Sequence, residues 1–331
     1  MPLRGTTEDE YRYFASMEAR GQSSLYEELA IGVAGDRDLI GLLADLPPEK
    51  RQPNLFFAAT RHVAGTPDDF RQFRQSVLDH REAVTTTMLA RRTQTNEPAR
   101  CAALYPVLAS LPQPLALLEV GASAGLCLLP DRYRYDYDGQ VAGDPHSPLT
   151  LRTTVEGAPP VAGPGAVTVA WRAGIDLNPL DVTDADDVRW LRTLVWPDQH
   201  DRLERLNRAI DLARPDPPPV VPGDLNARLT EVAAQAPPDA TLVVLHTAVL
   251  YYVPEADRNA FADQVQTLGG HWLSQEVPGV LPAVDARLRQ PPPPDALSYV
   301  VALDQRPLAF SAPHGDWVRR LPRDDAVDTP R

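Results

Sequence analysis

The sequence predicts an α/β fold: a doubly wound, mostly parallel sheet with a C-terminal antiparallel hairpin, preceded by an all-helical N-terminal region. From residue 8 to about residue 110, apolar residues recur three or four positions apart, which is the spacing of amphipathic helices. From residue 115 onward, short apolar runs alternate with helical patterns, which favours parallel strands joined by helices. Residues 297–318 contain two further strand-like runs, and these predict the hairpin.

The helical region contains six predicted helices with recognisable ends. The first begins after Thr6 and Thr7, which are followed by acidic residues, and stops at Gly21. The second and third have apolar residues three or four apart and also stop at glycine or proline. The six segments are 6–21, 23–36, 37–47, 52–65, 68–94 and 97–112.

Strands and helices alternate in the second part of the chain. The predicted strands are 115–120, 167–177, 218–224, 241–250 and 271–277. The predicted helices between them are 184–213, 225–236 and 255–269. We therefore expect a helical cap or substrate region at 1–112 and an α/β domain at 113–325, with an insertion at about 133–166 where Pro, Gly and Asp are frequent.

Charge and composition narrow the classes of function. The net charge is -13, which argues against a general nucleic-acid-binding surface because such a surface needs a basic patch. No uncharged apolar run is long enough to span a membrane, and the first residues lack the apolar core of a secretion signal. We expect a cytoplasmic protein with a small-molecule partner, no nucleic-acid or membrane partner and no metal site, since no metal-ligand spacing is present. Cys101 and Cys127 are expected to pack as reduced small hydrophobes.

The run Gly121-Ala122-Ser123-Ala124-Gly125 has two interpretations, and the first is a serine hydrolase. G-x-S-x-G between a strand and a helix is the nucleophile elbow, in which Ser123 would attack the substrate. Asp285 or Asp304 and then His314 supply the acid and the histidine in the required order. However, everything before residue 115 is predicted helical, whereas an elbow of this type has several strands upstream.

The second interpretation is a cofactor loop. Small residues at 121–125 would let the backbone approach a ligand, and the N-terminus of a following helix would offer N–H groups to an anion. Glu119 would lie at the end of the strand before the loop. Ligands of doubly wound sheets bind beyond the carboxyl ends of the strands, and Asp176, Asp224 and His246 end the next three predicted strands. These further polar strand ends favour the cofactor interpretation.

The succession resembles the class I S-adenosylmethionine-dependent methyltransferases, which have a Rossmann-like fold. Glu119, Gly121 and Gly125 match the acid and glycines of their first motif. Residues 174–179, 223–225 and 245–254 resemble the second motif, the third motif and the segment after the fourth strand, and the likeness extends over about 115–318. The runs 117–135, 174–182, 190–197 and 246–258 also resemble an uncharacterised bacterial family, a domain of unknown function.

The methyltransferase resemblance implies S-adenosylmethionine as the cofactor and a small-molecule methyl acceptor. The cofactor-binding residues it implies are Glu119, Gly121, Ser123, Gly125, Asp176, Asp224 and Leu225. His246 would serve as the general base, and Tyr251 would lie beside the substrate. The alternative within the same fold is a binding module that has lost methyl transfer.

Several assignments stay open on the sequence alone. Ser123 replaces the middle glycine of the motif, and about fifty residues separate Gly125 from Asp176. If residues 133–138 were the second strand, Asp136 or Asp138 would hold the ribose in place of Asp176. Simpler interpretations also exist, because aspartates such as Asp224 often cap helices and a histidine after an apolar run is often buried and structural.

Overall fold

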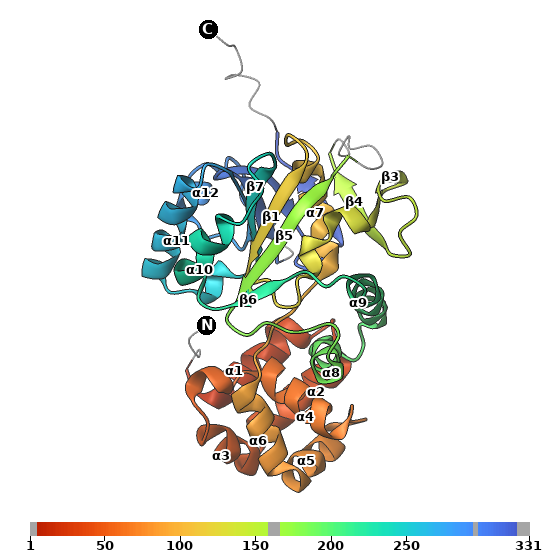
Figure 1. Cartoon of the computed structure of the whole chain (residues 1–331). Helices are drawn as coiled ribbons and strands as arrows, with labels where there is room; N and C mark the ends of the chain where they lie inside the picture. The colour runs from red at the N-terminus through yellow and green to blue at the C-terminus, as the bar shows by residue number, and fades with distance from the viewer. Residues whose placement is uncertain (1–4, 158–165, 294–296, 323–331) are drawn as a thin grey trace. The chain divides into compact units, whose positions relative to one another are not determined.

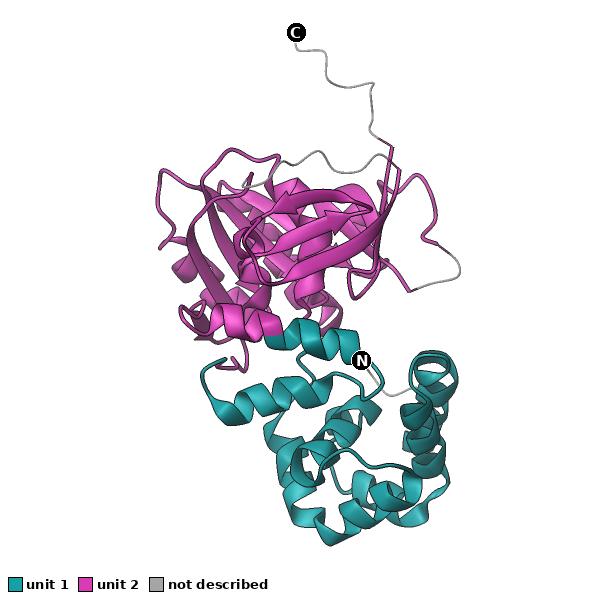
Figure 2. Ribbon diagram, turned by 90° about the vertical axis from the view of Figure 1, so that its right-hand side faces the viewer, with its two compact units in different colours: residues 1–95, 182–207 teal, residues 96–181, 208–331 magenta. Residues whose placement is uncertain are grey.

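The structure is a computed structural model that describes residues 5–157, 166–293 and 297–322 (Figure 1). The chain forms two compact units: unit 1 comprises residues 1–95 and 182–207, and unit 2 comprises residues 96–181 and 208–331 (Figure 2). This division differs from the predicted boundary after residue 112, because the last predicted helix of the N-terminal region packs on strands of unit 2. The predicted domain end at residue 325 lies outside the described residues.

Unit 1 is helical. Its helices are α1 (Thr7–Tyr13), a π-helix (Phe14–Ala19), α2 (Ser24–Gly35), α3 (Arg37–Ala44), α4 (Pro53–Ala64), α5 (Phe70–Asp79), α6 (Arg81–Ala90), α8 (Ala185–Leu194) and the first part of α9 (His200–Ala213). The single helix predicted over 184–213 is wrong: it divides around Pro197, which has no N–H to continue a helix. The helix predicted over 68–94 also divides, at His80.

The core of unit 1 is aromatic. Buried rings of α1, α2, α4 and α5 pack edge-to-face or tilted around Phe57, an arrangement that adds to the stabilisation from buried area. Arg61 of α4 donates hydrogen bonds to the carbonyls of Thr193 (2.9 Å) and Val195 (2.8 Å). These bonds satisfy carbonyls at the end of α8 that have no partner within that helix.

Unit 2 is built on one sheet of eleven described strands in the order β3-β2-β4-β11-β10-β9-β8-β7-β1-β5-β6. Five neighbouring strands are parallel: β6 (Val220–Pro222), β5 (Val169–Asp176), β1 (Leu115–Val120), β7 (Thr241–Thr247) and β8 (His271–Glu276). The order of these strands reverses at β1, because β5 and β6 lie on one side of it and β7 and β8 on the other. The predicted mixed α/β fold with a mostly parallel sheet is confirmed at this level.

The antiparallel strands follow the parallel ones. β9 (Tyr299–Leu303) pairs with β8 and with β10 (Arg306–Ser311), and β11 (Trp317–Arg320) pairs with β10. The predicted hairpin is therefore present. Its turn lies at Asp304 and Gln305, which have positive φ values of 51° and 63°; two positive values are typical of the tight turns that match strand twist.

The predicted insertion extends the sheet. β2 (Arg134–Tyr137) and β3 (Gln140–Gly143) form a hairpin, and β4 (Thr150–Glu156) pairs in parallel with both β2 and β11. The part of the insertion at 158–165 lies outside the described residues.

Helices cover the two faces of this sheet (Figure 1). α10 (Leu225–Ala233), α11 (Glu255–Thr267) and the short α12 (Pro282–Asp285) share a hydrophobic core with one face. α7 (Cys101–Leu108) contacts β4 and β9. Within the described part of the chain, no helix combines the length and apolar character that a membrane crossing requires.

Candidate functional site

The bend at 121–125 follows β1 at the carboxyl edge of the parallel strands. The amides of Gly121 and Ala122 donate to the Ile175 carbonyl of β5, at 2.7 and 3.2 Å. Gly121, Ser123 and Gly125 have positive φ values of 69°, 52° and 72°. Glycine adopts this conformation without strain, whereas for Ser123 it is uncommon. The bend is thus a tight turn held to the neighbouring strand.

The glycines of the bend make room for protein side chains. A Cβ atom on Gly121 would lie 2.4 Å from a methyl group of Val249, and one on Gly125 would lie 3.0 Å from Pro218. Gly174 of β5 likewise accommodates Ala122, at 2.5 Å. Each glycine therefore permits a close approach, as the sequence predicts, but in this structure the approaching group is a side chain of the same unit.

No α-helix follows the bend, which corrects the expectation of a helix N-terminus at this point. Two short 3-10 helices, Leu126–Leu128 and Pro130–Arg132, follow instead. The Leu126 amide donates to the Asn96 side chain at 3.0 Å, and a 3-10 turn of three residues provides no N-terminal anion site. The strand–turn–helix context of a nucleophile elbow is absent for the same reason.

Asp176 lies at the end of β5, directly beside the bend. Its carboxylate accepts hydrogen bonds from the Ser123 amide and the Asn178 amide, both at 2.8 Å, and its side chain is half-buried. Asp136 and Asp138 belong to the β2–β3 hairpin at the far end of the strand order. The strand next to β1 is β5, so Asp176 is the acid that the topology brings to the bend.

Asp224 and Leu225 follow β6. Asp224 is the N-cap of α10, where its carboxylate accepts from the amides of Asn226 (2.9 Å) and Ala227 (3.1 Å). Leu225 packs in the core beneath the sheet. The capping interpretation of Asp224 accounts for its contacts, and its side chain remains exposed.

Glu119 is buried near the end of β1. It is 1% exposed, and its Oε2 has no hydrogen-bond partner among the described residues. Burial raises the pKa of Glu119 well above its usual value, and the neighbouring Cys127 thiol adds to the rise. An unpartnered buried carboxyl is costly and needs an explanation; a bound ligand is one.

Glu119 shares its face of the sheet with Thr247, because it pairs with Leu245 in register and side chains alternate along a strand. On this face, Arg100 donates to the Thr247 carbonyl (3.0 Å), the Thr247 hydroxyl (3.2 Å) and the Pro313 carbonyl (3.1 Å). Arg100 is 6% exposed. Its buried positive charge partly offsets the rise in the pKa of Glu119.

His246 projects from the opposite face, where it belongs to a buried network. Trp272 Nε1 donates to His246 Nε2 at 2.9 Å, and His246 Nδ1 lies 2.8 Å from Glu276 Oε1. Because an indole N–H can only donate, Nε2 carries the lone pair and Nδ1 carries the proton. Both ring nitrogens are therefore engaged, and His246 is completely buried. This arrangement favours the structural interpretation of His246.

Tyr251 and Tyr252 follow β7 in a 3-10 helix (Leu250–Tyr252), with ring centroids 3.8 Å apart. Burial raises the pKa of Tyr251, which keeps its hydroxyl protonated. Tyr252 is exposed.

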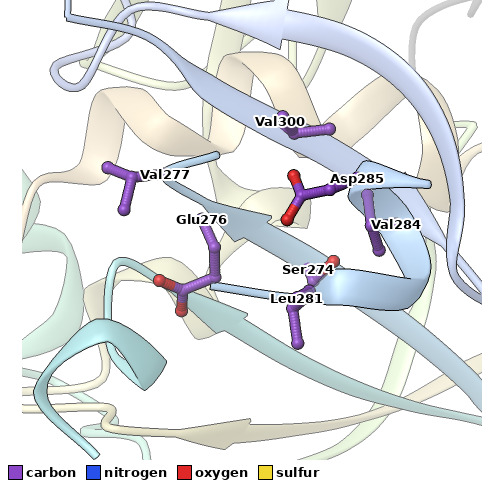
Figure 3. Close-up of a pocket in the computed structure, with 7 residues that line it drawn as sticks. All are labelled: Ser274, Glu276, Val277, Leu281, Val284, Asp285 and Val300. Carbon is purple, nitrogen blue, oxygen red and sulfur yellow. The ribbon is translucent and has the colours of Figure 1, made fainter. Parts of the chain in front are cut away.

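Two cavities lie on the His246 side of the sheet. One of about 10 Å³, close to the space one water needs, is lined by Ser274, Val284 and Asp285 among others. Figure 3 shows Asp285 beside this cavity, whereas the carboxylate of Glu276 points away from Asp285. The second, of about 180 Å³, lies between α11, α12 and Trp272. Neither includes a residue of the bend.

The remaining predicted residues are dispersed or structural. Asp304 accepts from the Trp272 amide at the amino end of β8, so it lies at the edge of the sheet opposite to Ser123. Cys101 and Cys127 are free, buried thiols. No cluster of three or more metal-ligating side chains occurs among the described residues.

Four contributors to the site were not predicted: Asn96, Arg100, Val249 and Trp272. Asn96 and Arg100 belong to unit 2, whereas the sequence predicts that residues 1–112 form the helical region. Their contacts are with segments far away in the sequence, so no local sequence pattern could predict them. The apolar surroundings of Val249 and Trp272 in the sequence indicate only burial.

Two comparisons with known proteins bear on the chain. The family model described as "Uncharacterized protein conserved in bacteria (DUF2332)" matches residues 8–320. No curated protein matches the chain significantly.

Proposed function

The chain belongs to the uncharacterised bacterial family DUF2332, and we propose from the site that unit 2 binds S-adenosylmethionine at the carboxyl edge of its parallel strands and transfers the methyl group to a small molecule. The observation that carries the proposal is the reversal of strand order at β1, with the bend and Asp176 directly at that point. Ligands of open α/β sheets bind where the strand order reverses.

The acids at this point suit a nucleoside with an amino-acid tail. The half-buried Asp176 carboxylate can accept hydrogen bonds from ribose hydroxyls, in addition to those from the bend. Glu119 offers an oxygen without a partner among the described residues, which an ammonium or hydroxyl group would satisfy. The Cβ side of Gly121 is filled by Val249, which would move for a ligand to reach it.

The cofactor supplies an already activated methyl group through its sulfonium. The chain would then contribute binding and alignment of the acceptor, which is a large part of the rate of such transfers. The predicted base, His246, has its free lone pair occupied by Trp272, and Tyr251 holds its proton because burial raises its pKa. The proposal therefore favours an acceptor that is nucleophilic without a general base on the protein, such as a thiolate or a neutral amine.

Calorimetric titration of the full chain with S-adenosylhomocysteine tests the proposal. We expect binding, and we expect Asp176→Asn to weaken it at least tenfold, since a hydrogen bond to a charged group contributes about 1.5–3 kcal/mol. Asp136→Asn is the matched control, because Asp136 also caps a turn through a backbone amide (Gly139, 2.8 Å). No binding by the wild-type chain at near-millimolar ligand would contradict the proposal, and equal weakening by both variants would contradict the role of Asp176.

A non-catalytic binding module of the same fold is the second candidate. The engagement of both His246 nitrogens favours it. Binding of S-adenosylmethionine without transfer of label to any member of a broad metabolite panel would support the module. Labelled product would support the methyltransferase.

The hydrolase is the third candidate, favoured only by the positive φ of Ser123. Labelling by a fluorophosphonate probe that is lost in Ser123→Ala would revive it. We expect no labelling, because no helix follows the bend.

A further inference from the structure

Val249 covers the bend. Its methyl groups occupy the space where a Cβ of Gly121 would lie, at 2.4 and 2.7 Å. Val249 belongs to the turn between β7 and the 3-10 helix Leu250–Tyr252. It is only half-buried, so movement of this one turn would free the side of Gly121 that Val249 fills.

One carboxylate oxygen holds this turn in place. Glu276 Oε1 accepts hydrogen bonds from the amides of Val249 (2.8 Å) and Leu250 (2.9 Å) and lies 2.8 Å from His246 Nδ1. Trp272 bonds to the other nitrogen of His246 and thereby directs the Nδ1 proton to Glu276. Glu276 Oε2 has no partner among the described residues. A single oxygen atom thus accepts the amides of both Val249 and Leu250.

The turn is also conformationally strained. Ala248 has a φ of 57°, a value that residues with a Cβ adopt rarely. Its amide donates to the Gln275 carbonyl at 2.8 Å. Strained residues persist only where their surroundings hold them, and the hydrogen bonds that the amides of the turn donate to the Gln275 carbonyl and the Glu276 carboxylate hold it.

We propose that residues 248–250 form a gate over the Gly121 bend, with Val249 as its closing side chain and Glu276 as the positioning residue that keeps it closed. Binding at the bend displaces Val249, so part of the binding free energy is spent on opening the turn. The identity of the ligand that opens the gate rests on the proposed function. The role of Glu276 in holding the turn is independent of that function.

The ligand arm compares the wild-type chain with Val249→Ala, using S-adenosylhomocysteine as the probe in calorimetry. We expect the variant to bind at least fivefold more tightly, because the smaller side chain no longer has to be displaced. Val253→Ala is the matched control, since Val253 lies four residues further along and packs on the core cluster, and we expect it to leave affinity unchanged. Wild-type binding that Val249→Ala does not tighten would overturn the gate.

The ligand-free arm measures amide hydrogen exchange by NMR in Glu276→Gln, which keeps the size of the side chain. We expect the amides of Val249 and Leu250 to exchange about tenfold faster, while the amide of Gly121, which is bonded to Ile175, changes little. Unchanged exchange at Val249 and Leu250 would overturn the role of Glu276. Faster exchange combined with no ligand binding by the wild type or by Val249→Ala would support that role and contradict both the proposed ligand and the gate.

Discussion

The two faces of the sheet differ at the same edge. On one face, His246, Glu276 and Trp272 form a network in which both ring nitrogens and one carboxylate oxygen are bonded. On the other face, Glu119 keeps an oxygen without a partner among the described residues, close to Arg100. Glu276 Oε2 also lacks a partner among the described residues, but Glu276 Oε1 accepts from two backbone amides and lies 2.8 Å from His246 Nδ1. Evolution can keep a network bonded in this way for stability alone, whereas burial raises the pKa of Glu119 well above its usual value and so disfavours its carboxylate. The Glu119 face is therefore the better place to look for a ligand.

The largest expected effect tests the face that carries the His246 network. Glu276→Ala removes the acceptor of three N–H groups. A buried donor without an acceptor costs about 1–3 kcal/mol, so we expect a loss of about 3–5 kcal/mol in the free energy of unfolding. Denaturant unfolding followed by circular dichroism measures it. Ser274→Ala is the control on the same strand, since its hydroxyl makes only one long bond of 3.5 Å. A loss below 1 kcal/mol for Glu276→Ala would show that the network contributes little.

A smaller effect is expected at Trp272. Trp272→Phe removes the N–H that faces His246 Nε2, and the unsatisfied buried nitrogen should cost about 1–3 kcal/mol. Trp171→Phe is a matched control, because Trp171 is a half-buried tryptophan at the margin of the same core. Nitrogen NMR of His246 should show a fixed Nδ1–H tautomer in the wild type and a mixture in the variant. A mixture already present in the wild type would contradict the assigned tautomer.

The smallest expected change is a gain in stability, on the face of the sheet that carries Glu119. Because burial raises the folded-state pKa of Glu119, the folded chain holds this proton more tightly than the unfolded chain. The protonated Glu119 therefore contributes stability at low pH. This contribution to the free energy of unfolding is lost as the pH rises from about 4.5, the pKa in the unfolded chain, toward the higher pKa in the folded chain. Glu119→Gln mimics the protonated form and should raise stability at pH 7 by about 1–2 kcal/mol.

Glu156 is the control for Glu119, because its pKa is shifted in the opposite direction. The Arg319 guanidinium lowers the pKa of the exposed Glu156, so stability from that pair is present at neutral pH and is lost as the pH falls. Glu156→Gln should therefore lower stability slightly at neutral pH, and its difference from the wild type should disappear as the pH falls and Glu156 is protonated in both states. A stability profile of Glu119→Gln that stays parallel to the wild type from pH 5 to 8 would contradict the raised pKa.

Local sequence patterns predicted the strands of the parallel part but not the contacts between them. The continuous apolar runs at 115–120 and 271–276 identify buried strands, and both have the predicted bounds to within one residue. Pro197 indicates a break between two helices, but the helical spacing on both sides of it predicts one continuous helix over 184–213. The pairing of Arg100 with Thr247 depends on long-range register, so no local signal could reveal it.

The same limit applies to the bend. The small residues at 121–125 predict a close approach of the backbone to a ligand, and the structure shows positive φ values at Gly121 and Gly125 with protein side chains close to both. The sequence could not say that Val249 and Pro218 are the groups that approach. The roles of Glu119, Asp176 and the bend in cofactor binding remain predictions, and so do those of His246 and Tyr251 in catalysis.

Strand β11 lies between β10 and β4 and is the link between the three strands of the insertion and the rest of the sheet. At usual elongation rates, β4 is synthesised on the order of ten seconds before β11. Throughout that interval the edge of β4 offers unpaired backbone groups to any passing chain. The vulnerable moment in the biogenesis of this protein is therefore set by the late arrival of four residues, Trp317–Arg320.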